Sequence, residues 1–191
     1  MIIGITGGSG CGKTTLLNFI AEKGGLILDC DAIYHQLLKT DADMLSAIGT
    51  RFPGVIEEGQ LNRKKLGAIV FAEEQALLDL NAITHTAVKK EVLRHLESAP
   101  ALAAIDAIGL FEGGLGELCD VTVAVTAPGE DRVKRLMARD GISEGYARAR
   151  IEAQHDDDWF RRHCDHLLVN DGDLDAFATK CLAFWAYLGI M

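Results

Sequence analysis

Apolar residues follow two different spacings along this chain, and the two spacings alternate. Five short runs are apolar at nearly every position, which is typical of parallel strands covered on both faces; they span residues 1–6, 26–28, 102–107, 121–125 and 167–169. Between them, apolar residues recur every three or four positions, which predicts helices; these span residues 13–24, 32–52, 61–71, 73–97, 131–139 and 174–188. The alternation predicts an α/β fold of three layers, with a five-stranded parallel sheet flanked by helices.

Local signals refine this outline. Asp41 is a candidate N-cap within the stretch 32–52, and Pro53-Gly54 ends that stretch. A polar turn is expected at residues 57–60. In the last helix, the apolar side chains expected to pack on the sheet are Phe177, Leu182, Trp185 and Leu188.

A glycine-rich loop directly follows the first predicted strand. Its sequence Gly7-Gly8-Ser9-Gly10-Cys11-Gly12-Lys13-Thr14 matches the phosphate-binding pattern G-x-x-x-x-G-K-[ST], between a strand and a helix. Glycines let the backbone close on an anion, so that N–H groups and the start of the helix face the phosphates. Lys13 is expected to reach the β- and γ-phosphates, and the Thr14 hydroxyl to coordinate Mg²⁺. We predict an ATP site formed by Gly8, Ser9, Gly10, Cys11, Gly12, Lys13, Thr14 and Thr15.

Acidic side chains follow two of the predicted strands. Asp29 and Asp31 come after the second strand, Asp106 ends the third, and Glu112 lies shortly beyond it. Ligands of open α/β sheets bind beyond the carboxyl ends of the strands, so these acids are expected beside the phosphate loop. We predict that Asp31 orients or deprotonates an attacking hydroxyl; capping of the next helix is the alternative. We predict that Asp106 binds Mg²⁺ through water; an acid in a surface turn is the alternative.

The charge is unevenly distributed. The formal net charge of −9 argues against a nucleic acid or an anionic membrane surface as the main partner, because clustered Lys and Arg hold such partners. Residues 132–162 nevertheless carry eight of the 19 basic side chains, against six acidic ones. Arg132, Arg135 and Arg139 share one face of the predicted helix 131–139. We predict a lid whose guanidinium groups bind phosphate oxygens; a solvated charged face is the alternative.

The sequence also bears on the cellular compartment. Its apolar runs are all shorter than the roughly 18 residues of a membrane span, and its N-terminus opens a predicted core strand rather than a signal peptide. The five cysteines are scattered and odd in number, which is typical of reduced thiols. We therefore expect a cytoplasmic protein without a membrane partner. The pattern makes no prediction of the oligomeric state.

Two other classes of nucleotide-binding protein share part of this pattern. Asp106-Ala107-Ile108-Gly109 spells the D-x-x-G of GTP-hydrolysing switch proteins, but the guanine-reading N-K-x-D element does not occur in the chain. A nucleotide-binding regulator without catalysis would carry the same loop, although the acids at the strand ends disfavour it. The residues therefore favour a kinase that phosphorylates the hydroxyl group of a small molecule. Nucleosides and nucleotides are among the candidate acceptors.

The predicted elements form one domain. We assign the core to residues 1–30, 100–130 and 165–191, and the lid to about 139–160. The sixty or so residues between the second and third strands contain no convincing strand, and they exceed what a simple crossover requires. We expect this segment, about 32–97, to be a helical insertion that forms the acceptor pocket.

Taken together, these motifs resemble the dephospho-coenzyme A kinase family of P-loop kinases. The resemblance runs over almost the whole chain, and its motifs occur in the same order. They are the phosphate loop, Asp29-Cys30-Asp31 with His35, Gly59-Gln60-Leu61-Asn62-Arg63, Asn81-Ala82-Ile83-Thr84-His85, Leu110-Phe111-Glu112, Arg135–Asp140, Arg150–Gln154 and Asn170-Asp171-Gly172.

The resemblance implies a reaction and a set of site residues. The reaction is phosphorylation of the ribose 3′-hydroxyl of dephospho-coenzyme A by ATP and Mg²⁺. Lys13, Asp31 and Arg139 would be the catalytic residues, and Asn170 would lie near the adenine. The acceptor would contact Asp31, His35, Arg63, His85 and Glu112.

The chain departs from the family pattern at two prolines. Thr86 replaces the proline that usually follows the histidine, and Ile108 replaces the proline of the usual D-x-P-L-L-F-E.

Overall fold

Five parallel strands form the central sheet, in the order β2-β5-β1-β6-β7. The computed structural model describes residues 1–190. The strands are β1 (Ile2–Thr6), β2 (Leu26–Asp29), β5 (Ala103–Asp106), β6 (Val121–Thr126) and β7 (His166–Val169). All neighbouring pairs are parallel, which confirms the predicted sheet, and each strand end lies within one residue of the expected position.

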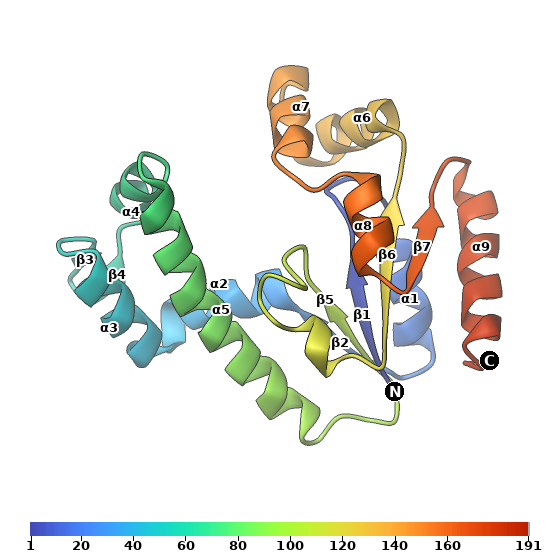
Figure 1. Cartoon of the computed structure of the whole chain (residues 1–191), viewed down its shortest axis with the longest axis horizontal. Helices are drawn as coiled ribbons and strands as arrows, with labels where there is room; N and C mark the ends of the chain where they lie inside the picture. Colours follow the sequence, from blue (N-terminus) through green and yellow to red (C-terminus); the bar gives the residue numbers. More distant parts are fainter. Residues whose placement is uncertain (191) are drawn as a thin grey trace.

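Helices cover both faces of this sheet (Figure 1). On one face, α1 (Lys13–Glu22) and α9 (Leu174–Tyr187) pack on Ile3 and Ile5 of β1. On the other face, α2 (Cys30–Thr40) and α5 (Glu74–Leu96) pack on Leu28 of β2 and Ile105 of β5. Successive strand residues point to opposite faces, so an uninterrupted apolar run supplies both cores.

The predicted contact face of α9 is wrong at one position. Phe177 and Trp185 are buried, but Leu182 is 51% exposed, and Cys181 and Phe184 complete the buried face instead. Leu182 follows Phe177 by five residues, which is about 140° around a helix of 3.6 residues per turn. Its side chain therefore points away from the sheet.

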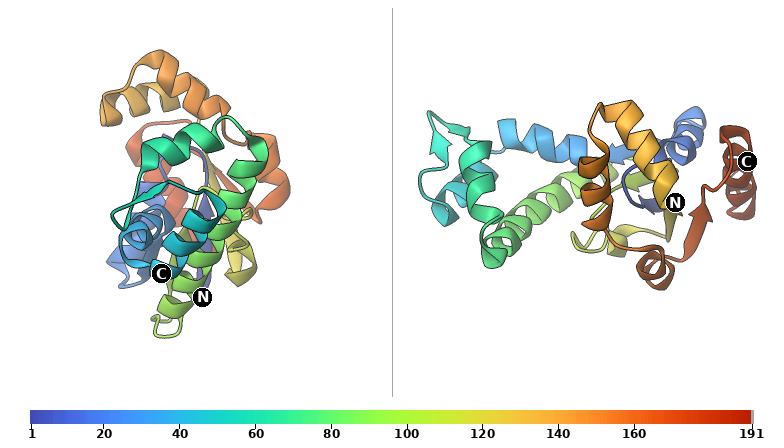
Figure 2. Two further views of the ribbon diagram at one scale, coloured as in Figure 1. Left: turned by 90° about the vertical axis from the view of Figure 1, so that its left-hand side faces the viewer. Right: turned by 90° about the horizontal axis from the view of Figure 1, so that it is seen from above.

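A helical lobe is inserted between β2 and β5 and extends away from the sheet (Figure 1, left; Figure 2). It contains α2, α3 (Ala42–Arg51), a two-stranded hairpin of β3 (Ile56–Glu57) and β4 (Gln60–Leu61), α4 (Arg63–Val70) and α5. Two expectations need correction here. The stretch 32–52 is two helices, because Asp41 is extended and accepts a hydrogen bond from the Met44 N–H at 2.9 Å, which caps α3. The polar turn expected at residues 57–60 is confirmed, and its central residues, Glu58 and Gly59, both have positive φ. The expectation that the segment contains no strand is wrong, because β3 and β4 pair on either side of this turn.

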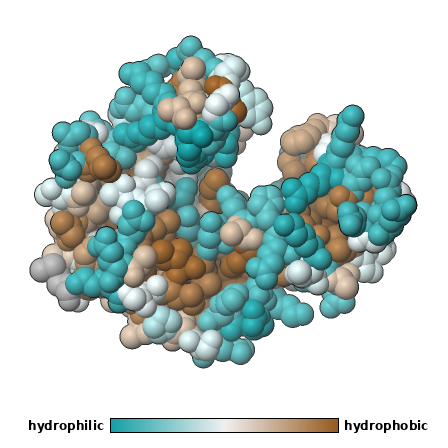
Figure 3. Space-filling model, turned by 180° about the vertical axis from the view of Figure 1, so that it is seen from behind, coloured by the Kyte–Doolittle hydropathy of each residue, from teal (hydrophilic) through white to brown (hydrophobic). Residues whose placement is uncertain are grey.

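Three helices connect β6 to β7: α6 (Gly129–Asp140), α7 (Glu144–Glu152) and α8 (Asp157–His163). α6 and α7 lie above the carboxyl ends of the strands, whereas α8 packs against β6 and β7 (Figure 1). α6 and α7 pack through Val133, Leu136 and Ala147. Seen from behind, the surface is deeply hollowed between these lid helices and the helical lobe (Figure 3). None of the helices within residues 1–190 is long and apolar enough to cross a membrane.

Candidate active site

The phosphate loop forms one wall of a cavity of about 630 Å³ at the carboxyl end of the sheet. The lining residues come from the loop, from the ends of β2 and β5, and from the lid: Gly8 to Thr14, Asp29, Asp31, Asp106, Ile108, Arg135, Ala138, Arg139 and Arg150. The Lys13 Nζ donates a hydrogen bond to the Gly7 carbonyl oxygen at 3.0 Å. Thr14 is exposed in the first turn of α1. The loop therefore presents its backbone, an ammonium group and a hydroxyl to one cavity.

Asn170, which directly follows β7, holds the phosphate loop through a side-chain hydrogen bond. This buried side chain donates from Nδ2 to the Cys11 carbonyl oxygen at 2.9 Å. Gly12 has a φ of 97°, and a Cβ at this position would lie 2.5 Å from the Asn170 Nδ2. Glycine is therefore required there by both backbone and space. Asn170 and Thr15 do not line the cavity, and their contact with the nucleotide stays a prediction.

The lid contacts the loop through a buried polar cluster that the sequence did not predict. Gln154 Oε1 accepts from the Ser9 N–H at 2.9 Å and from Arg132 Nη2 at 2.8 Å, and Gln154 Nε2 donates to Ser9 Oγ at 2.9 Å. Arg132 Nε donates to the Ser9 carbonyl oxygen at 3.0 Å. Arg132 is only 7% exposed, so the alternative of a solvated charged face does not hold for this residue. Its guanidinium contacts the phosphate loop itself and does not line the cavity, so its contact with phosphate oxygens stays a prediction. A buried guanidinium needs hydrogen-bond acceptors, and the Ser9 carbonyl oxygen and Gln154 Oε1 provide two of them here.

The two aspartates after β2 have different surroundings. Asp29 Oδ1 accepts a hydrogen bond from the Ala32 N–H at 2.9 Å and thereby caps α2. The capping alternative raised for Asp31 therefore belongs to Asp29. Asp31 is exposed in the first turn of α2 and lines the phosphate-loop cavity and a second, adjoining one.

Asp106 lies at the end of β5 in the same cavity. Its pKa is raised to about 6, mainly by burial; the charge of Lys13 lowers the pKa, and the charges of Asp29 and Asp31 raise it. Lys13 compensates only part of the cost of burying this carboxylate beside two other acids, and a divalent cation would compensate the rest. The hydroxyl of Thr14 and the carboxylate of Asp106 are hard oxygen ligands, so the residues present fit Mg²⁺. The described residues contain no group of three or more His, Cys, Asp or Glu that could hold a metal, so phosphate oxygens would supply other ligands.

The second cavity, of about 260 Å³, lies between α2, α5 and the loop after β5. Asp31, Tyr34 and His85 line it together with mostly apolar residues: Cys30, Leu80, Asn81, Thr84, Val88, Ala107, Ile108, Gly109, Gly113 and Leu115. Burial is the main cause that raises the pKa of Tyr34, and the nearby Arg63 charge lowers it. Asp31 joins this cavity to the phosphate loop.

Three predicted acceptor contacts lie outside the lining of this second cavity. His35 is exposed, with its ring 5.5 Å from the ring of Tyr34. Arg63 is exposed at the start of α4 and borders a separate hollow with Leu38 and Gln60. Glu112 pairs with His155 of the lid at 2.5 Å. Contact of these three residues with an acceptor stays a prediction.

The lid arginines differ in what they face. Arg139 lines the phosphate-loop cavity and pairs with Asp140, which also pairs with Arg150 at 3.1 Å. Arg135 lines the same cavity and donates to the Gly10 carbonyl oxygen at 3.3 Å. Arg148 pairs with Glu130 and Glu144 and does not line the cavity. Three guanidinium groups thus face the position expected for a triphosphate.

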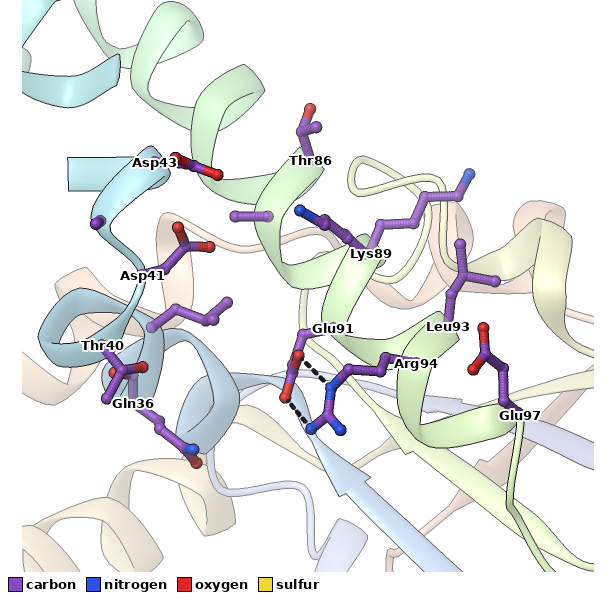
Figure 4. Close-up of a pocket in the computed structure, with 14 residues that line it drawn as sticks. Gln36, Thr40, Asp41, Asp43, Thr86, Lys89, Glu91, Leu93, Arg94 and Glu97 are labelled. Atoms are coloured by element: carbon purple, nitrogen blue, oxygen red, sulfur yellow. Dashed lines mark hydrogen bonds and ion pairs between the residues drawn. The ribbon is translucent and has the colours of Figure 1, made fainter. Parts of the chain in front are cut away.

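A hollow of about 900 Å³ is a separate open groove between α2, α3 and α5 (Figure 4). It shares no lining residue with the other two cavities. Several of its charged side chains are engaged locally: Arg94 pairs with Glu91 at 2.7 Å, Lys89 pairs with Glu117 at 3.1 Å, and Asp41 caps α3. The groove also contains neither the phosphate loop nor the acids at the strand ends. We therefore place the active site at the phosphate loop rather than in this groove.

Comparison with known proteins identifies the relatives of this chain. The family model for dephospho-CoA kinase matches residues 1–176. A dephospho-CoA kinase of Salinibacter ruber is 36% identical and covers 98% of each chain. The crystal structure of TT1252 from Thermus thermophilus has a TM-score of 0.82 at 32% identity, covering 98% of this chain and 97% of its own. A dephospho-CoA kinase from Campylobacter jejuni has a TM-score of 0.67 at 25% identity, covering 100% and 98%. The resemblance seen in the sequence is confirmed: the chain belongs to the dephospho-CoA kinase family, which transfers a phosphoryl group to an alcohol acceptor.

Proposed function

We propose that the two adjoining cavities bind the two substrates of this family's reaction. ATP occupies the cavity of the phosphate loop, and dephospho-CoA presents its ribose 3′-hydroxyl from the cavity lined by Tyr34 and His85. The observation that carries this assignment is the position of Asp31, which lines both cavities. A carboxylate at such a junction can contact an acceptor hydroxyl while that hydroxyl faces the γ-phosphate.

Asp31 is the proposed base. Its carboxylate accepts the proton of the ribose 3′-hydroxyl as the oxygen bonds to the γ-phosphorus. The bond between that phosphorus and the β,γ-bridging oxygen breaks, and ADP leaves. General-base assistance of this kind contributes about 10²–10⁴-fold to rate.

The loop and the lid stabilise the transferring group. Lys13 and the backbone amides of residues 8–14 bind the phosphates, and Arg139 leaves Asp140 to reach the phosphoryl oxygens. Thr14 and Asp106 would hold Mg²⁺, which neutralises charge on the phosphates when it is bound. Asn170 and Thr15 complete the proposed nucleotide site.

The helical insertion, about residues 32–97, serves as the acceptor subdomain, and residues of about 139–160 serve as the lid. His35, Arg63 and Glu112 would contact parts of dephospho-CoA that extend beyond the small cavity. A cytoplasmic location is supported by five free cysteines, which suit a reducing compartment.

The test is ADP release with a panel of acceptors at fixed ATP and Mg²⁺. We expect dephospho-CoA to be turned over, and adenosine, AMP and shikimate to give only the background ATP hydrolysis. Turnover of a nucleoside without a response to dephospho-CoA would favour a P-loop kinase of another acceptor. ATP binding without ADP release for every acceptor would favour a nucleotide-binding regulator.

A further inference from the structure

A stack of aromatic rings joins the lid to the loop after β5, outside both cavities. We call it the ring cluster; its members are Phe111, His155, Trp159 and His163. The indole of Trp159 lies between two imidazoles, with ring centroids 3.7 Å from His155 and 3.9 Å from His163. Phe111 meets Trp159 edge-on at 5.7 Å.

Glu112 adds a polar contact to the ring cluster. Its Oε1 lies 2.5 Å from the His155 Nε2, and both side chains are about two-fifths exposed, at 40% and 43%. An exposed pair of this kind contributes little to stability. Its larger consequence is positional, because it joins two segments that are 43 residues apart in sequence.

The loop that carries Phe111 and Glu112 is also a wall of the acceptor cavity. Five of its residues line that cavity: Ala107, Ile108, Gly109, Gly113 and Leu115. A ligand in the cavity would therefore contact the same loop that the ring cluster contacts.

The lid residue next to His155 makes a second contact, with the phosphate loop. Gln154 directly precedes His155 and forms the polar cluster with Ser9 and Arg132. Ser9 belongs to the phosphate loop and lines the nucleotide cavity. Two adjacent residues of one segment thus contact the walls of both substrate sites.

We propose that His155 and Trp159 are positioning residues that make acceptor and nucleotide binding cooperative. An acceptor in the second cavity sets the position of the loop 107–115, and the contact of Glu112 with His155 transmits that position to Gln154 and Ser9. The nucleotide then binds a phosphate loop that is already held in its binding position, so the two ligands favour the same arrangement. By linkage, the nucleotide increases acceptor affinity by the same factor. This inference rests on the proposed use of the second cavity by dephospho-CoA.

The alternative is that the ring cluster only stabilises α8. Phe160 is the buried residue of that helix, whereas His155 and His163 are exposed. A purely structural cluster would change the free energy of unfolding without changing the coupling between the two ligands. The coupling factor is therefore the measurement that separates the two roles.

The test uses ADP and dephospho-CoA, a pair that cannot react. The Kd of ADP is measured by calorimetry with and without saturating dephospho-CoA. We expect dephospho-CoA to tighten ADP binding at least fivefold in the wild-type protein, within the usual range of about 5–150-fold. We expect His155→Ala and Glu112→Gln to reduce this factor to below twofold.

The matched control is His95→Ala. His95 is a similarly exposed histidine that lies 3.2 Å from Glu91, but both residues belong to α5. Its replacement removes a histidine–glutamate pair without unlinking two segments, so the wild-type coupling should remain. A coupling factor of one in the wild-type protein would overturn this inference but not the proposed function. A His155→Ala variant that keeps the wild-type coupling factor would do the same. Failure of dephospho-CoA to bind at all would overturn the proposed function and the inference with it.

A spectroscopic measurement gives a second readout. The chain has two tryptophans, and Trp185→Phe leaves Trp159 as the sole indole. This replacement breaks no hydrogen bond, because the buried Trp185 Nε1 has no partner within the described chain. We expect dephospho-CoA alone to change the fluorescence of Trp159 in this variant, because the stacked imidazoles shift with Glu112. An unchanged spectrum at saturating dephospho-CoA would contradict the coupling.

Discussion

Asp29 and Asp106 lie side by side on β2 and β5, at the same register position of the parallel pair. Their proximity, the charge of Asp31 and above all burial explain why the pKa of Asp106 is raised to about 6, against the attraction of Lys13. The carboxyl ends of two strands thus bring like charges together next to the phosphate loop. The apoprotein carries this unfavourable interaction, and a cation at the site would relieve it.

We expect Asp106 to make the apoprotein less stable as the pH rises from about 4 to 7. The pKa of Asp106 is higher in the folded protein than in the unfolded chain, so the folded state binds more protons within this window. The free energy of unfolding therefore falls as the pH rises, and the loss is complete above the folded pKa. At about 1.4 kcal/mol per pKa unit, the loss in the free energy of unfolding is on the order of 2–3 kcal/mol.

Urea unfolding of wild type and Asp106→Asn at pH 4.5, 6 and 7.5 measures this contribution. The variant should gain stability relative to wild type as the pH rises, and its Mg²⁺-dependent turnover should fall. A stability difference that is constant over this range would contradict the assignment.

Asp31 and Asp29 form a matched pair for testing the base. Asp31→Asn should lower kcat by about 100-fold or more, because the amide cannot accept the hydroxyl proton. Asp29→Asn keeps an Oδ1 acceptor for the Ala32 N–H, and asparagine caps helices as well as aspartate does, so its kcat should stay within about tenfold. Steady-state ADP release and circular dichroism measure turnover and folding. Near wild-type turnover of Asp31→Asn would remove this residue from the mechanism.

Lys13→Ala should lower kcat by about two or more orders of magnitude. Its ammonium lies at the phosphate loop, and the loss of one charge-stabilising contact costs about 10²–10³-fold. Lys23→Ala, at the other end of the same helix, is the control; that ammonium lies over the Phe19 ring. Single-turnover kinetics should show the loss for Lys13 only, and an equal loss for both would indicate damage to α1 instead.

Gly8→Ala should disrupt the docking of the lid on the phosphate loop. A Cβ at Gly8 would lie 2.1 Å from Arg132 Nη2 and 2.9 Å from Gln154 Oε1, so the buried polar cluster would have to move. We expect ADP affinity to fall by about tenfold, which corresponds to about 1.4 kcal/mol. Gly145→Ala in α7 meets no atom within 4 Å, and alanine in a helix should stabilise it by about 0.5–1 kcal/mol. ADP titration calorimetry distinguishes the two, and unaltered affinity in Gly8→Ala would contradict this account.

Arg139→Gln should reduce kcat more than it weakens ADP binding. Arg139 faces the cavity but pairs with Asp140, so its contact with phosphate would form during the reaction. Arg148→Gln removes a lid guanidinium that pairs with Glu130 and Glu144 away from the cavity. Comparing kcat with the Kd of ADP should separate the two variants. Equal effects on kcat would mean that the lid acts only through its overall charge.

Much of the fold could be predicted from local patterns. The apolar runs fixed the five strands within a residue, and the order strand, glycine-rich loop, helix located the phosphate site at residues 7–14. These features depend on the spacing of neighbouring residues, which the sequence displays directly. The errors were also local: Asp41 divides one predicted helix, and Leu182 lies off the buried face of α9.

The tertiary structure decided which of these residues work together. Asp29 and Asp31 have the same chemistry in the sequence, and only packing makes one a cap and places the other between two cavities. Gln154 reaches Ser9 across 145 residues of sequence. The sequence by itself determined the elements and the phosphate loop, because periodicity and turn chemistry are local. The polar cluster, the second cavity and the ring cluster depend on how separate helices pack against one sheet, and no local spacing encodes that.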